Sequence, residues 1–119
     1  MQALADFAAA RGHIVTGSDN SISGHDPKNV EGCDLVVYTC AVQPSNCELA
    51  RAHEKGIPVI ERAVYLGELA ATYGKTVAIA GCHGKSTTTA MTGAGFSAYS
   101  PTVHVGVANG SKVGSDRFF

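Results

Sequence analysis

The sequence predicts an α/β fold in two parts, and three observations support this prediction. Short β-branched runs alternate with segments of helical periodicity, which is the pattern of βαβ units. Within the run at 34–38, residues 35–37 are continuously apolar, as in a parallel sheet that is covered on both faces. The run at 76–79 leads directly into a glycine loop. We therefore predict an incomplete Rossmann-like parallel-sheet domain at 1–74, followed by the start of a P-loop ATPase domain at 75–119.

The first helix and the first two strands follow from apolar periodicity. Residues 1–11 predict a helix that Gly12 ends, because glycine adopts the left-handed conformation after a helix without strain. Residues 13–16 and 34–38 predict strands. The intervening segment 20–32 is rich in turn-forming residues and has no clear period. The apolar face of the first helix consists of Leu4, Phe7 and Ala8.

A helix, a strand and a second helix complete the first part. Ser45 and Glu48 have the S-x-x-E spacing of a capping box, which predicts a helix that begins here and ends before Gly56. Residues 57–60 predict a short strand, and the proline within it indicates an edge position or a strand start. Residues 62–73 predict a helix, and we place the domain boundary directly after it.

The second part carries weaker signals after its glycine loop. Residues 87–91 predict the start of a helix, although glycines follow soon afterwards and each costs about 1 kcal/mol in a helix. Residues 102–105 predict a strand, and the Asn-Gly pair at 109–110 predicts a turn. The two phenylalanines at 118–119 indicate the opening of a further strand.

Composition and charge exclude several classes of function. The net charge is −1, so no basic field indicates a nucleic-acid partner. No apolar run approaches the ~18–20 residues of a membrane span and no signal peptide is evident, so we expect no membrane partner. The four cysteines form no CxxC pair, which argues against a zinc site and fits a reducing, cytoplasmic location. Three of them are expected to be small buried or half-buried hydrophobes: Cys33, Cys40 and Cys47.

The glycine loop contains the residue types that bind phosphate. Glycines let several backbone N–H groups point at one anion, and the following helix adds the positive end of its dipole. Lys85 would reach the β- and γ-phosphates of ATP, and the hydroxyl of Ser86 would bind Mg²⁺. The loop is shorter than the general pattern, which has a glycine at the position of Ile79. An ordinary strand-to-helix turn with a chance Gly-Lys-Ser is the alternative. The predicted cofactor-binding residues are Gly81, Cys82, His83, Gly84, Lys85, Ser86 and Thr87.

This form of the loop resembles that of the Mur ligases, the ATP-dependent amide-bond-forming enzymes of peptidoglycan synthesis. Their loop typically reads Gly-Thr-His/Asn-Gly-Lys-Thr-Thr-Thr, and the present loop matches it from residue 81 to residue 88. The same resemblance extends over most of residues 1 to about 90. Four further stretches carry it in the family's order: 15–19, 24–30, 33–42 and 56–63.

The resemblance implies a reaction and a set of residues. The loop with His83 is most similar to that of the member which joins L-alanine to UDP-N-acetylmuramate through an acyl phosphate. ATP and Mg²⁺ are then the implied cofactors, and those two small molecules are the implied substrates. Lys85 is the implied catalytic residue, and Ser86 is the implied metal ligand. The implied UDP-sugar pocket consists of Ser18, Asp19, His25, Thr39, Cys40 and Ala41.

Alternatives remain open for single residues and for the function. Asp19 follows a predicted strand at the sheet edge where ligands bind, but a structural turn fits the spacing equally well. His25 could bond a ligand or simply face water. A non-catalytic nucleotide-binding fragment or pseudo-ligase is the alternative function, and a sister ligase that adds a preformed peptide to the same sugar nucleotide is another. The sequence indicates no oligomeric state.

The chain also departs from the family's pattern. The family's first strand and its glycine-rich loop would precede Met1, and the crossover at 20–23 is reduced to turn residues. An acidic metal ligand and the third domain have no counterpart, so we expect the chain to be incomplete and inactive alone. Cys82 replaces the usual threonine, and Val64 replaces a common glutamate. We expect ordered pieces of a longer ligase joined end to end, with a shortened protein as the alternative.

Overall fold

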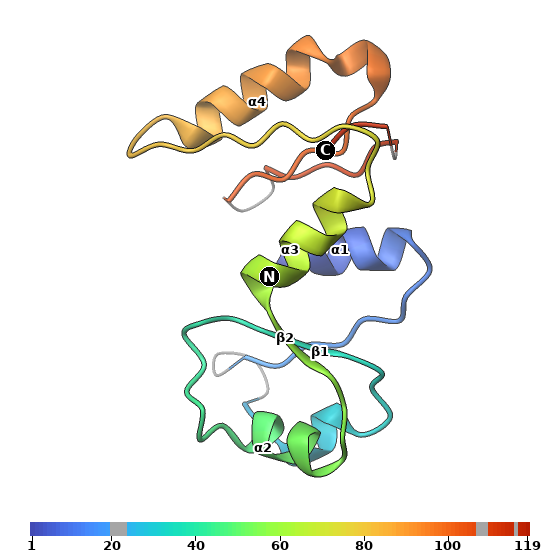
Figure 1. The fold of residues 1–119 in the computed structure, drawn as a ribbon, viewed down its shortest axis with the longest axis vertical. Coiled ribbons are helices and arrows are strands. Elements are labelled where there is room, and N and C mark those ends of the chain that lie inside the picture. The colour runs from blue at the N-terminus through green and yellow to red at the C-terminus, as the bar shows by residue number, and fades with distance from the viewer. Residues whose placement is uncertain (20–23, 107–109, 116) are drawn as a thin grey trace. The chain divides into compact units, whose positions relative to one another are not determined.

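The computed structural model describes residues 1–19, 24–106, 110–115 and 117–119 (Figure 1). The packing of the chain forms two compact units. We call Val15–Gly67 the sheet unit, and we call Met1–Ile14 together with Glu68–Phe119 the glycine-loop unit. The two units describe only how this chain packs, and they do not test the predicted domain boundary after residue 74. That boundary stays a prediction.

The sheet unit contains a small parallel sheet. Strand β1 (Val36–Tyr38) pairs with strand β2 (Val59–Glu61) in parallel, with Val36 opposite Val59 (Figure 1). Helix α2 (Cys47–Glu54) lies between them in the chain, as a parallel crossover requires. The mixed α/β arrangement and these two strands are confirmed. A complete P-loop domain stays a prediction.

Helix α2 and a short 3₁₀ helix form the core of the sheet unit. The 3₁₀ helix η1 (Pro27–Val30) is capped by Asp26, whose carboxylate accepts from the amide of Lys28 at 2.8 Å. Helix α2 packs against η1 and β2. The predicted glycine end of α2 is confirmed, because Gly56 has a φ of +69° and Ile57 N–H donates to the carbonyl of Ala52 at 2.9 Å. The buried apolar residues are Val30, Leu49 and Ala52.

The predicted capping box at Ser45 and Glu48 is wrong. The residue that caps α2 is Asn46, whose side-chain oxygen accepts from the amides of Glu48 and Leu49 at 2.9 Å and 3.4 Å. Asparagine and serine cap helices about equally well, so two adjacent cap-forming residues leave the start ambiguous by one position. Because the helix begins at Cys47, the carboxylate of Glu48 is available for other contacts.

The predicted strand at 13–16 is also wrong. These residues form no strand, and the side chain of Ile14 is 98% exposed. A β-branched run becomes a strand only where a neighbour satisfies its backbone N–H and C=O groups. Among the described residues, β1 and β2 form the one sheet, and neither pairs with 13–16.

Helix α1 (Gln2–Ala10) provides the largest part of the core of the glycine-loop unit. Its predicted face is confirmed, since Leu4, Phe7 and Ala8 are all buried. Its predicted end is confirmed as well: Gly12 has a φ of +88°, and His13 N–H donates to the Ala8 carbonyl. Helix α3 (Arg62–Ala71) begins in the sheet unit and ends in this one, where Leu69 is buried.

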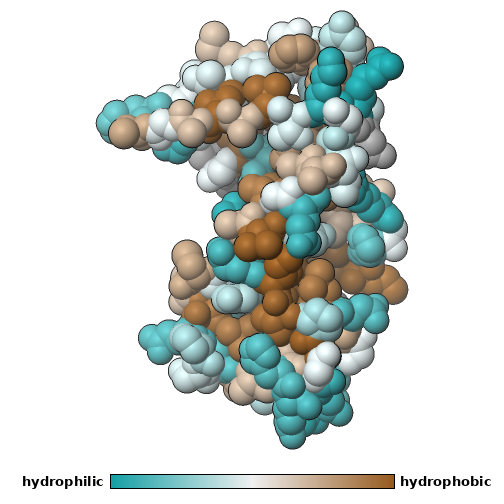
Figure 2. All heavy atoms as spheres, in the orientation of Figure 1, coloured by the Kyte–Doolittle hydropathy of each residue, from teal (hydrophilic) through white to brown (hydrophobic). Residues whose placement is uncertain are grey.

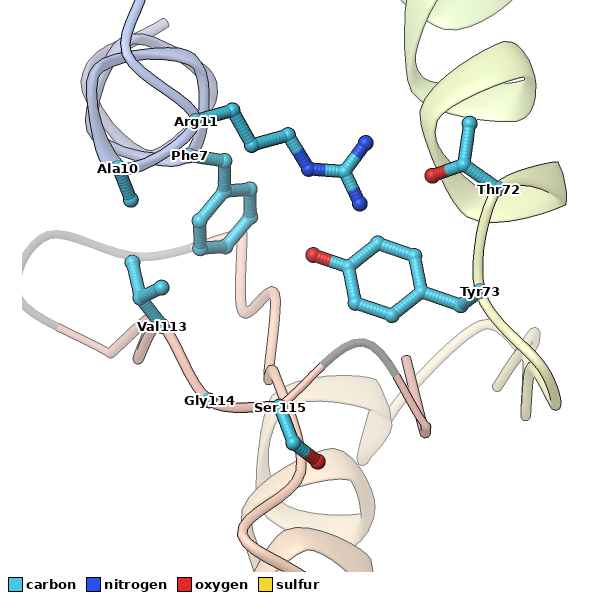
Figure 3. Close-up of a pocket in the computed structure, with 8 residues that line it drawn as sticks. All are labelled: Phe7, Ala10, Arg11, Thr72, Tyr73, Val113, Gly114 and Ser115. Carbon is cyan, nitrogen blue, oxygen red and sulfur yellow. The ribbon is translucent and has the colours of Figure 1, made fainter.

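An aromatic cluster surrounds α1 in the glycine-loop unit. The ring of Phe7 meets those of His104 and Phe119 edge-on, with centroids 5.9 Å and 6.0 Å away. Tyr73 packs on Phe119 at 4.9 Å, and the guanidinium of Arg11 lies 4.9 Å from the Tyr73 centroid (Figure 3). These contacts tie α1 to the end of α3 and to the C-terminal residues.

The predicted strands at 76–79 and 102–105 are not formed as strands. The structure has isolated bridges here, between Lys75 and Phe118 and between Val103 and Lys112. Val77 N–H donates to the Phe119 carbonyl at 2.8 Å, so the 118–119 end is paired, as a strand opening would be. Within the described ranges, no further pairing extends these bridges into a ladder. The predicted turn at 109–110 lies outside the described residues.

Other expectations have mixed outcomes. Cys33 and Cys47 are half-buried, as predicted, whereas Cys40 is exposed and the prediction for it is wrong. Cys40 lies in the turn that follows β1, and turns run over the surface. In the described part of the chain, no helix has the length and apolar character that a membrane span requires.

Candidate functional site

The glycine loop leads directly into helix α4 (Lys85–Gly95). Gly84 is the residue before the helix, and its φ of +75° is a left-handed conformation that an L-residue adopts only at a cost. Its carbonyl accepts the Thr88 amide at 2.9 Å, which closes the first turn. The helix therefore starts at Lys85, two residues before the predicted start, and no side chain caps it.

The side chain of Lys85 folds back over the loop. Its ammonium donates to the carbonyl of Gly81 at 2.6 Å and to that of Cys82 at 3.3 Å. Lys85 and the four loop residues before it are exposed, so this cation stands at the open N-terminal end of α4. A positive side chain beside the positive end of a helix dipole favours an anion there.

The same residues fit the phosphates of ATP better than they fit a metal ion. Of the first turn of α4, Ser86 is half-buried while Thr87 and Thr88 are exposed, so Ser86 offers a hydroxyl beside the loop. Across the described residues, no three His, Cys, Asp or Glu side chains gather in a way that could hold a metal. One hydroxyl is an incomplete set for Mg²⁺, which also requires phosphate oxygens and water.

Helix α4 presents apolar side chains at its surface. None of its residues is buried, and Met91 is 69% exposed. Figure 2 shows apolar residues at the surface over α4 and the extended segment before it, where Val77 is also exposed. One face of α4 is half-buried, at Ser86, Thr89, Thr92 and Gly93, and the rest of the helix is exposed.

A second polar group of residues surrounds Glu48 in the sheet unit. Glu48 is only 8% exposed, although it carries a carboxylate. Its Oε2 accepts the Ser18 hydroxyl at 2.7 Å and lies 2.9 Å from Nδ1 of His25. Its Oε1 accepts the side-chain amide of Asn29 at 2.7 Å and the backbone N–H of Asp26 at 3.3 Å. We call these five residues the Glu48 cluster.

The environment of Glu48 keeps it ionised. Burial raises the pKa of its carboxyl, but hydrogen bonds from Asn29, Ser18, His25 and the Asp26 amide outweigh burial and hold the pKa below its ordinary value of 4.5. The carboxylate is consequently an acceptor on both oxygens. No buried side-chain nitrogen or oxygen lacks a partner in the part of the chain that the structure describes.

The structure brings together some of the predicted substrate residues and separates others. Ser18 and His25 meet at the Glu48 cluster, with Oγ and Nδ1 3.4 Å apart. Asp19 is exposed, and its carbonyl accepts the Gly24 amide at 3.0 Å. The stretch 39–41 follows β1, and no hydrogen bond among the described residues joins it to Ser18 or His25. The roles of all these residues stay predictions.

Sequence reasoning missed Glu48 as a member of a candidate site, and it missed Asn29 as a structural support of that carboxylate. Glu48 was assigned to helix capping, and the choice of Asn46 as the cap removes that role. A carboxylate in the second position of a helix, next to a Leu–x–x–Ala face, is the signal that could have identified it. Burial of a charged residue then requires partners, and Ser18, His25 and Asn29 supply them.

Two surface hollows lie elsewhere. In the glycine-loop unit, a hollow of about 550 Å³ lies between α1, the end of α3 and residues 113–115 (Figure 3). In the sheet unit, another of about 560 Å³ lies between η1 and α2. Neither is lined by a predicted site residue. The candidate sites are therefore the open glycine loop and the part of the Glu48 cluster formed by Ser18, His25 and Glu48.

Comparison with known protein families identifies the family of this chain. The family described as "Mur ligase family, catalytic domain" matches residues 1–74, which is more than half of the chain. The chain belongs to the Mur ligase family.

The curated relatives point to one member of this family. The chain is 38% identical to the UDP-N-acetylmuramate–L-alanine ligase of Acetivibrio thermocellus, over 100% of this chain and 30% of the relative. It is 43% identical to the ligase of the same name from Persephonella marina and 42% identical to that from Chlorobium phaeobacteroides, each over 99% of this chain and 30% of the relative.

The extent of these matches matters for the interpretation. The chain spans about a third of the length of the curated relatives it matches. The alignment with the Acetivibrio protein has 141 positions and includes all 119 residues, so 22 or more positions have no residue from this chain. This difference agrees with the expectation that internal elements of the family are shortened here.

Proposed function

We propose that this chain is the nucleotide-binding part of a ligase that joins L-alanine to UDP-N-acetylmuramate at the expense of ATP, in peptidoglycan synthesis. The observation that carries the proposal is the agreement along nearly the whole chain with relatives that bear this name. The loop geometry supports it independently, because a left-handed Gly84, a helix N-terminus and the ammonium of Lys85 converge on one open site.

The proposed chemistry is two successive displacements. A carboxylate oxygen of the sugar's lactyl group attacks the γ-phosphorus of ATP, and the bond to ADP breaks to give an acyl phosphate. The amine of L-alanine then attacks the acyl carbon, and phosphate leaves with the carboxylate oxygen and the bonding electron pair. In this scheme the loop amides hold the phosphates, and Lys85 stabilises the charge that spreads over the transferred group.

The remaining predicted residues receive roles in the same proposal. Ser86 supplies one oxygen to Mg²⁺ that the phosphates of ATP bring with them, and Gly81 to Thr87 surround those phosphates. We propose that the reaction takes place in the cytoplasm. It consumes ATP and a sugar nucleotide, and the four cysteines of this chain are unpaired, as is usual in a reducing compartment. The UDP-sugar side of the site is assigned to Ser18, Asp19, His25, Thr39, Cys40 and Ala41.

The test is the substrate dependence of ADP release by the protein that contains this chain. Mg·ATP is supplied alone, with UDP-N-acetylmuramate, and with UDP-N-acetylmuramate plus L-alanine, and the coupled product is identified by mass spectrometry. The proposal predicts sustained ADP release and an alanine adduct only when both substrates are present, because UDP-N-acetylmuramate alone supports only the first displacement. Binding of both nucleotides without turnover would indicate a non-catalytic module, and turnover with a peptide instead of L-alanine would indicate the sister ligase.

A further inference from the structure

We infer that Glu48 is a positioning residue for the sugar-nucleotide site: it locks the tautomer of His25 and the hydroxyl direction of Ser18, so that both present hydrogen-bond acceptors to the ligand. The inference rests on the proposed function. Its starting observation is that a single buried carboxylate receives the side chains of Ser18 and His25, two of the predicted substrate residues, on the same oxygen.

The two carboxylate oxygens of Glu48 contact different groups of residues. Oε1 accepts from Asn29 and from the backbone of Asp26, and both contacts fasten the carboxylate to the start of η1. Oε2 accepts from Ser18 and His25, which precede η1 in the chain. The first pair of contacts holds Glu48 in place, and the second pair lets Glu48 orient its neighbours. The two functions can therefore be separated by mutation.

The contact with Glu48 fixes which nitrogen of His25 carries a proton. An ionised carboxylate has no proton to donate, so Nδ1 at 2.9 Å from Oε2 must be the N–H donor. In the neutral imidazole the other nitrogen, Nε2, is then an acceptor. The His25 side chain is 22% exposed, so a ligand can reach Nε2, for which the structure shows no hydrogen bond from a described residue.

The contact with Glu48 also fixes the direction of the Ser18 hydroxyl. Its hydroxyl hydrogen points to Oε2 at 2.7 Å, which leaves the oxygen lone pairs to accept. Oγ of Ser18 lies 3.4 Å from Nδ1 of His25, so the two acceptors, Oγ and Nε2, belong to neighbouring side chains, which we call the acceptor row. Acceptors select hydrogen-bond donors. We therefore assign this row to the hydroxyl and imide N–H groups of the uridine moiety rather than to the pyrophosphate, whose oxygens only accept.

The experiment uses the 119-residue chain, with UDP-N-acetylmuramate and Mg·ATP as separate titrants in calorimetry and with ring ¹⁵N NMR of the histidines at pH 8. Glu48→Gln keeps the shape of the side chain but places an N–H₂ group among donors. Glu54→Gln removes the same charge from the exposed side of α2 and is the matched control. Asn29→Ala removes an Oε1 contact and reports the purely structural part of the role of Glu48.

The expected pattern is specific. Wild type and Glu54→Gln show His25 protonated on Nδ1, and Glu48→Gln loses this signature and weakens UDP-N-acetylmuramate binding at least about tenfold while ATP binding is unchanged. Asn29→Ala lowers the melting temperature but retains the tautomer and stays within about threefold in affinity. Equal losses of affinity in Glu48→Gln and Asn29→Ala, or an unchanged tautomer in Glu48→Gln, would overturn the inference.

A second variant covers the case in which Glu48→Gln does not fold. His25→Asn keeps an N–H near the Nδ1 position for Glu48 but has no group at Nε2, so it should remain folded and lose affinity to the same degree. Wild-type-like affinity of His25→Asn, or a wild-type His25 protonated on Nε2 alone, overturns the inference. If the wild-type chain does not bind UDP-N-acetylmuramate at all, the proposed function fails and the inference fails with it.

Discussion

Replacing Lys85 by alanine separates the ligand chemistry of the glycine loop from its folding. The side chain is exposed, and its two hydrogen bonds go to carbonyls of its own loop at 2.6 Å and 3.3 Å. No buried group loses a partner when it is removed, because those carbonyls face water. Exposed substitutions of this kind change the free energy of unfolding by roughly 0.5 kcal/mol or less. The variant should therefore fold normally.

The cost should appear in nucleotide binding instead. A charge-assisted hydrogen bond from Lys85 to a phosphate oxygen contributes about 1.5–3 kcal/mol. At 1.4 kcal/mol for each factor of ten, the dissociation constant for Mg·ATP should rise about 10- to 150-fold. In the complete ligase reaction the loss should be larger, because the ammonium also faces the charge that develops on the transferred phosphoryl group.

The assay is calorimetric titration of wild type and Lys85→Ala with Mg·ATP, together with thermal melts of both. Lys55→Ala is the matched control, since Lys55 is an exposed lysine that follows α2 and is not part of the loop. The reasoning is refuted if Lys85→Ala binds Mg·ATP within threefold of the wild type, or if Lys55→Ala loses as much affinity as Lys85→Ala does.

Three further predictions address stability, pH and reactivity. Leu49 is buried against η1, so Leu49→Ala should destabilise the sheet unit by about 2–5 kcal/mol, seen as a lower urea midpoint. The pKa of Glu48 is lowered in the folded chain, so its contribution to the free energy of unfolding is present above pH 4.5 and disappears as the pH falls below that value. Urea titrations should therefore show a lower free energy of unfolding at pH 3 than at pH 7, and this difference should be smaller in Glu48→Gln. Cys82 and Cys40 are both exposed, but only Cys82 lies in the glycine loop. Mg·ATP should therefore slow the labelling of Cys82 by iodoacetamide and leave that of Cys40 unchanged, as measured by mass spectrometry. Equal protection of both thiols would contradict the loop assignment.

Local signals in the sequence predicted the elements that depend on local physics. The face of α1 followed from the spacing of Leu4, Phe7 and Ala8, and all three are buried. Gly12 and Gly56 end their helices with positive φ, which glycine adopts at the lowest cost. The runs that became β1 and β2 are short and rich in β-branched residues, and they pair with each other.

Features that depend on distant partners were less predictable. The run at 13–16 has strand composition, but strand formation requires a neighbouring ladder that the sequence alone does not reveal. The start of α2 depended on a choice between Ser45 and Asn46, two residues of nearly equal capping strength. That choice decides the direction of the Glu48 side chain, and hence whether the Glu48 cluster exists.

The central claim is that this chain binds the phosphates and the sugar nucleotide for a ligation that proceeds through an acyl phosphate. It is tested most directly by following a carboxylate oxygen. UDP-N-acetylmuramate with oxygen-18 in its lactyl carboxylate is turned over with Mg·ATP and L-alanine by the protein that contains this chain, and the released phosphate is analysed by mass spectrometry. The account predicts that each phosphate carries one labelled oxygen. Unlabelled phosphate, or no phosphate release when both substrates are present, would contradict it.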